Sequence, residues 1–116
     1  MGEGGRGRPT GTVNVELFRT ALERLRELNL VSYQMWVLAG LADWWAAEGR
    51  LEDAARILGF LDRHDPGGNQ SVADLRAHAA ELVDVHTEAA AWRAHGAACA
   101  RDEVIRRCLD DLRDQT

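Results

Sequence analysis

Lysine is absent from this sequence of 116 residues, so that all 14 basic side chains are arginine. A Walker-type phosphate loop and a Schiff-base enzyme both need a lysine, and both are therefore excluded. The arginine bias indicates a GC-rich, bacterial genome. The formal net charge of −5 provides no positive field for phosphate groups, so we expect no direct binding of nucleic acid.

Cysteines and long apolar runs are also scarce. The only two cysteines, Cys99 and Cys108, are nine residues apart, which places them on opposite sides of one straight helix and disfavours a disulfide. No apolar stretch approaches the roughly 18 residues of a membrane span, and no secretory leader is recognisable. We expect a cytoplasmic protein with reduced thiols and no membrane partner.

The chain length suits one domain with one core. Residues 1–12 are rich in glycine and arginine and lack apolar partners, which predicts a disordered leader. Residues 13–114 are expected to form a single helical-repeat domain.

Apolar residues recur at three- and four-residue steps along that domain, and no segment alternates as a strand does. The sequence therefore predicts an all-α fold of antiparallel hairpins with about five helices. The second predicted helix is apolar on nearly every side and should be central. The fourth is either continuous or bent near Asp84. The predicted helices span residues 13–28, 33–48, 51–63, 72–95 and 101–112.

Several residues predict where these helices begin and end. Ser32 suits the N-cap of the central helix, and Ser71 followed by Asp74 resembles a capping box. Gly49 suits the C′ position after the central helix. Asp65, Pro66 and two glycines stop the third helix, and Gly96 is expected to interrupt the chain before the last one.

One hairpin carries the spacing of a tetratricopeptide repeat, a pattern of about 34 residues. Small residues, Ala42 and Ala54, are spaced to receive the bulky side chains of the facing helix, so Trp44 and Trp45 are expected to be packing residues first. The matching positions are Leu38, Leu41, Ala42 and Trp45, then Ala54 and Leu58, then Pro66.

The segments LAGLADWWAAEGRLEDAARILGFLD and AAAWRAHGAACARDEVIRRCLDDL resemble the C-terminal tetratricopeptide-like region of bacterial ATPase-type, LuxR-like transcription regulators. The resemblance covers about Leu17 to Leu112. It implies a regulatory or protein-interaction module, without the ATPase and DNA-binding parts of such regulators. Only scaffold positions carry over, namely Leu41, Ala42, Gly49, Ala54, Leu58, Trp92 and Gly96.

Catalytic and metal chemistry find little support in the pattern. The four histidines have no pair at the i, i+3 or i, i+4 spacing of a helical metal site. His95 and Cys99 are four residues apart and could lie side by side on a helix, but Gly96 stands between them. We expect no catalytic residue, metal or cofactor, and no enzyme activity.

The preferred hypothesis is therefore a non-catalytic helical module that binds a protein or peptide partner, or a second copy as a homodimer. The alternative is a small-molecule sensor with a pocket lined by tryptophans. The candidates for the binding face are Trp36, Trp44, Arg56, Arg63, Arg76 and Arg93.

Overall fold

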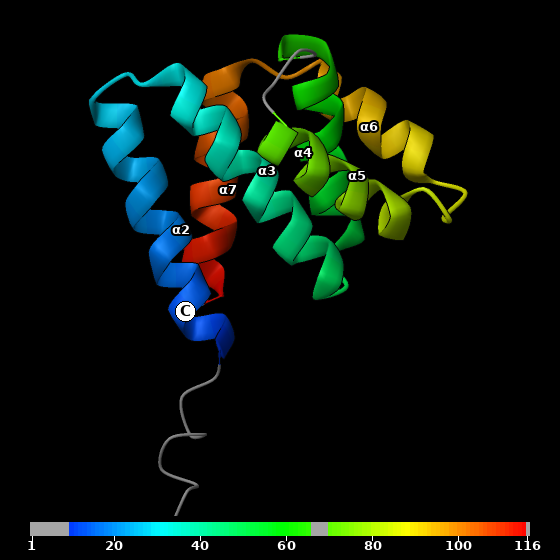
Figure 1. The fold of residues 1–116 in the computed structure, drawn as a ribbon, viewed down its shortest axis with the longest axis horizontal. Coiled ribbons are helices and arrows are strands. Elements are labelled where there is room, and N and C mark those ends of the chain that lie inside the picture. The colour runs from blue at the N-terminus through cyan, green and yellow to red at the C-terminus, as the bar shows by residue number, and fades with distance from the viewer. Residues whose placement is uncertain (1–9, 66–69, 116) are drawn as a thin grey trace, which may run out of the picture.

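The computed structural model describes residues 10–65 and 70–115, and in these ranges the chain is all-α without strands. The described residues form six helices, close to the five or so that the sequence predicts (Figure 1). They are α2 (Thr10–Glu27), α3 (Val31–Ala47), α4 (Leu51–His64), α5 (Gln70–Val83), α6 (Ala89–Ala97) and α7 (Arg101–Asp114).

Helix α3 is central, as its apolar surface predicts, since it packs against α2, α4 and α5. Leu38, Leu41 and Ala42 are fully buried, and Trp45 is 1% exposed. On the facing helix, Ala54 and Leu58 are also buried. The small and large side chains of this hairpin therefore form the centre of the core.

The two turns that flank α3 have the same backbone hydrogen bonds. After α2, the N–H of Leu30 donates to Leu25 O at 3.0 Å, and after α3 the N–H of Arg50 donates to Trp45 O at 2.8 Å. These are the 6→1 bonds of a Schellman motif. Gly49, with φ +89°, occupies the predicted C′ position, and Asn29, with φ +56°, has the same role 20 residues earlier.

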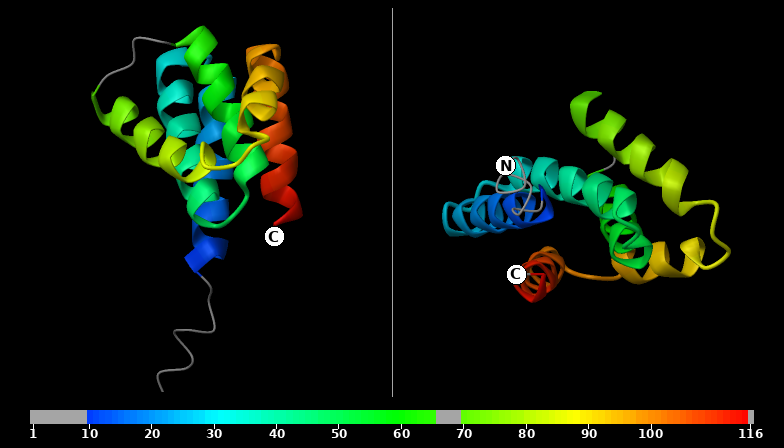
Figure 2. Two further views of the ribbon diagram at one scale, coloured as in Figure 1. Left: turned by 90° about the vertical axis from the view of Figure 1, so that its right-hand side faces the viewer. Right: turned by 90° about the horizontal axis from the view of Figure 1, so that it is seen from below.

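Helices two apart in the chain pack together beyond the central hairpin. α5 lies against α3, and α6 lies against α4. Figure 2 shows α5 and α6 on one side of the molecule and α2 and α7 on the other, where these last two pack together. The indole N–H of Trp45 donates to Gln115 Oε1 at 2.8 Å and ties the central helix to the C-terminal end.

The apolar side of α7 agrees with its sequence pattern. Five of its side chains are buried, namely Val104, Ile105, Cys108, Leu109 and Leu112. α4 ends at His64, before the predicted stop, and residues 66–69 of that stop lie outside the described residues.

Several predicted boundaries are wrong. Ser32 lies inside α3, whose N-cap is Leu30 without a side-chain bond. Ser71 lies inside α5, where Gln70 Nε2 instead donates to Asp74 Oδ1 at 2.8 Å. Both serines come directly after the first residue of their helix, too late in the chain for either to be its N-cap. Residues 10–12, which were predicted to be disordered, belong to α2, and residues 1–9 lie outside the described residues.

The fourth predicted helix is two helices, because the chain turns between Val83 and Ala89. Arg93 holds this turn by contacting both carboxylate oxygens of Asp84 at 3.0 Å. Gly96 does not interrupt the helix, since it lies within α6. It is buried there because the helix backbone approaches α4 at this point.

Candidate functional site

An apolar groove on α3 and a charged cleft beside α7 are hollows of the described surface that could bind another molecule. The groove lies between α2, α3 and α5 and has a volume of about 380 Å³. Its lining side chains are apolar except for the hydroxyl of Tyr33 and the indole N–H of Trp36. The lining residues are Phe18, Leu25, Tyr33, Trp36, Val37, Gly40 and Leu75.

The central helix contributes the most exposed side chains of this groove. Tyr33 is 56% exposed and Trp36 is 43% exposed. Their positions, with Val37 and Gly40, repeat at three- and four-residue steps along one face of α3. This spacing was visible in the sequence, but the all-round apolar character of the segment concealed which face remained uncovered.

Trp44 has a different role from Trp36. It is half-buried, and its ring stacks on Phe18 of α2, with centroids 5.6 Å apart and an interplanar angle of 18°. This contact joins α2 to α3. Of the two candidate tryptophans, Trp36 is therefore the one that is open to a partner.

Three of the four candidate arginines are held in ion pairs within the chain. Arg76 and Arg93 share the carboxylate of Asp62, with Nη2–Oδ1 at 2.5 Å and Nη1–Oδ2 at 2.6 Å, respectively. Since Arg93 also contacts Asp84, these side chains link α4, α5 and the start of α6. Arg63 is exposed and makes no ion pair among the described residues.

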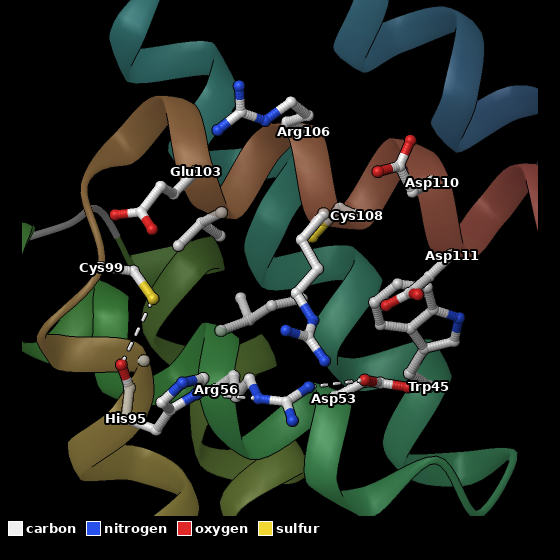
Figure 3. A pocket seen from close by; sticks show the side chains of 14 residues that line it. Trp45, Asp53, Arg56, His95, Cys99, Glu103, Arg106, Cys108, Asp110 and Asp111 are labelled. Carbon is white, nitrogen blue, oxygen red and sulfur yellow. Dashed lines mark hydrogen bonds and ion pairs between the residues drawn. The ribbon is translucent and has the colours of Figure 1, made fainter.

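The charged cleft lies between α4, α6 and α7 and has a volume of about 320 Å³ (Figure 3). The third arginine, Arg56, lines this cleft and contacts three other side chains. Its Nη1 contacts Asp53 Oδ1 at 3.1 Å, and its Nη2 contacts Glu52. Its Nε donates to His95 Nδ1 at 3.1 Å. Because Nδ1 accepts this bond, the imidazole proton is on Nε2.

Cys99 and His95 are four residues apart in the sequence, but the thiol and the imidazole form no hydrogen bond with each other. Cys99 Sγ donates instead to the backbone oxygen of His95 at 3.3 Å, and the ring of His95 is engaged by Arg56. Cys99 lies between α6 and α7, beyond the end of a helix rather than on a continuous one. The imidazole is therefore not placed to accept the proton of the thiol.

Cys108 lines the same cleft from α7. Burial raises the pKa of this thiol far above its ordinary value, and Asp111 and Asp53 raise it further. A thiol held in its neutral form is a poor nucleophile. The two cysteines are both free.

Asp53 and Asp111 form a pair of like charges at this cleft. Arg50 lies between them, with Nη2 at 2.8 Å from Asp53 Oδ2 and 4.0 Å from Asp111 Oδ2. Burial raises the pKa of the Asp111 carboxyl, and the charge of Asp53 raises it further. No spacing in the sequence indicates this pair, because the two carboxylates lie on different helices, α4 and α7.

In the described ranges, no group of three or more histidine, cysteine, aspartate or glutamate residues is positioned to hold a metal ion. Nor does any helix there combine the length and apolar character needed to cross a membrane. Comparison with protein-family models, curated proteins and solved structures gives no match for this chain.

Proposed function

We propose that this chain is a non-catalytic, cytoplasmic interaction module that binds an apolar segment of a partner protein in the groove on α3. The observation that carries the proposal is the exposure of Tyr33 and Trp36 in a groove with almost no polar lining. Exposed apolar patches of this kind are typical of interaction surfaces, and tryptophan is enriched among residues that contribute most to binding.

The groove geometry favours a helical partner. It runs between two packed helices, α2 and α3, and is bounded by Leu75 of α5. A groove of this form accepts an amphipathic helix whose bulky side chains recur at three- and four-residue steps. The candidate arginines are less suited to the contact, because Arg56, Arg76 and Arg93 would have to leave their internal partners.

The relation to tetratricopeptide-like regulators remains part of the proposal. Its support is the packing of α3 with α5 and of α4 with α6, which is the neighbour pattern of stacked helix–turn–helix units. The repeated Schellman turns before and after α3 are consistent with it.

The test is selection of displayed helical peptides against the intact protein, followed by affinity measurement on Trp36→Glu. A matched control is Leu82→Glu, because Leu82 is 38% exposed on α5 and does not line the groove. We expect selected peptides to have apolar anchors at helical spacing, to lose affinity for Trp36→Glu and to keep it for Leu82→Glu. Peptides that bind both variants equally well would disprove this assignment of the groove.

A further inference from the structure

A separate pocket of about 370 Å³ lies at the end of the molecule where α3 and α7 begin and α4 ends. It shares no lining residue with the groove on α3. Its floor is apolar: Met35, Phe60 and Val72 line it and are each at most 5% exposed. This volume is within the range of small-molecule sites.

Two opposite charges line this pocket without pairing with each other. Arg101 and Asp65 both contribute to the lining and are half-buried. No ion pair joins them, and among residues 10–65 and 70–115 the guanidinium of Arg101 has no hydrogen-bond partner. The bond from Arg76 Nη1 goes to the backbone oxygen of Asp65, at 2.7 Å, and leaves its carboxylate available.

The surrounding groups reinforce this separation of charge. The N-terminal end of α7 carries partial positive charge at Arg101, and the C-terminal end of α4 carries partial negative charge beside Asp65. Ser32 adds a hydroxyl to the lining. His64 also lines the pocket, with its ring stacked on Phe60 at 4.6 Å between centroids.

We propose that this pocket binds a free α-amino acid with an apolar side chain. This would be a second role, in addition to the protein binding proposed above. The carboxylate of the ligand pairs with Arg101, its ammonium group pairs with Asp65, and its side chain contacts Met35, Phe60 and Val72. Such a zwitterion satisfies both unpaired charges at once, which an ion of one sign does not.

Calorimetric titration of the intact protein with L-leucine and L-phenylalanine tests the site. Two analogues of leucine separate its charges: 4-methylpentanoate lacks the ammonium group, and 3-methylbutylamine lacks the carboxylate. We expect leucine to bind at least about tenfold more tightly than either analogue, which is the effect of one lost charged hydrogen bond.

Two variants should show opposite patterns. Arg101→Gln should weaken leucine and 4-methylpentanoate but not 3-methylbutylamine, whereas Asp65→Asn should weaken leucine and 3-methylbutylamine but not 4-methylpentanoate. The control is Arg106→Gln, since Arg106 is exposed on the same helix and lines a different cleft.

Two results would each overturn the proposal. Either no binding of either amino acid at millimolar concentration, or leucine affinity that is unchanged in Arg101→Gln, removes the site. Trp36 does not line this pocket. The effect of Trp36→Glu on peptide binding therefore tests the groove on α3 independently of the amino-acid site.

Discussion

Gly59 of α4 and Gly96 of α6 lie at a reciprocal close approach of two helix backbones. A Cβ atom on Gly59 would be 1.9 Å from the carbonyl oxygen of Arg93, and one on Gly96 would be 1.8 Å from that of Arg56. Each glycine therefore accommodates the backbone of the helix that carries the other. The two arginines at this crossing, Arg93 and Arg56, also form ion pairs with carboxylates of the chain.

The first prediction concerns this crossing. Gly59→Ala and Gly96→Ala should each lower the free energy of unfolding by about 1–3 kcal/mol or more, because the helices must separate to admit a methyl group. Urea denaturation measures the change. The control is Gly40→Ala, where the new Cβ would be 3.5 Å from Phe18 Cε1, an ordinary contact. There the gain in helix propensity, up to about 1 kcal/mol, should leave stability equal or higher. Equal effects at all three positions would contradict the close approach.

The second prediction concerns the carboxylates that Arg93 joins. Arg93→Gln should destabilise the protein by about 1 kcal/mol, because the contacts to Asp62 and Asp84 form a network rather than one exposed pair. Hydrogen exchange should increase first in residues 84–88. Arg63→Gln is the matched control, and its effect should remain within about 0.5 kcal/mol. Unchanged exchange in this turn would show that Arg93 does not hold it.

The third prediction is a pH dependence of the link between α5 and α3. The hydrogen bond and charge of Asp43 raise the pKa of His78 above its ordinary 6.5, Glu81 raises it slightly, and desolvation opposes them. Because the folded pKa is the higher one, the stabilising contribution is complete below 6.5 and is lost as the pH rises through the folded pKa. An NMR titration of the His78 ring should show the raised pKa, and Asp43→Asn should lower it toward 6.5. An unchanged value in that variant would exclude this ion pair in solution.

The fourth prediction concerns thiol labelling of the native protein with a disulfide reagent near neutral pH. Cys108 should remain unlabelled until the protein unfolds, because it is buried and its pKa is raised. Cys99 should react more slowly than a fully exposed thiol because it is half-buried, and no imidazole is placed to activate it. Cys99→Ala should remove the only native phase, with Cys108→Ala as its control. Rapid labelling of Cys99 would restore the thiol and imidazole hypothesis.

The fifth prediction concerns self-association, which the exposed ends of a short helical array favour. Leu17 is 64% exposed on α2, and Leu28 just beyond that helix is 62% exposed. We expect a dimer by light scattering over a concentration series and a monomer for Leu17→Arg. Thr20→Arg, also exposed on α2, is the control for added charge. A wild-type monomer at every concentration would contradict the homodimer that the sequence analysis expects.

The sequence determined the helices and most of their buried faces by itself, because an amphipathic helix buries most of the apolar residues in its periodic stripe. Residue spacing and type predicted the all-α class, the central place of α3 and the buried side of α7. They also predicted the C′ position of Gly49, which has the positive φ typical of that position. Trp36 was a sequence candidate, but its exposure depends on which faces of α3 are covered by α2, α4 and α5.

Tertiary structure alone decided how distant residues combine. No glycine or proline marks the turn at residues 84–88, which is held by a side chain nine residues after Asp84. The tertiary structure placed Gly59 against the backbone of α6 and gave the arginines their internal partners. It also placed Asp65 and Arg101 in the lining of one pocket, although they are far apart in the sequence. Local periodicity specifies a helix face, but only the packing angle and register of the helices specify what that face meets.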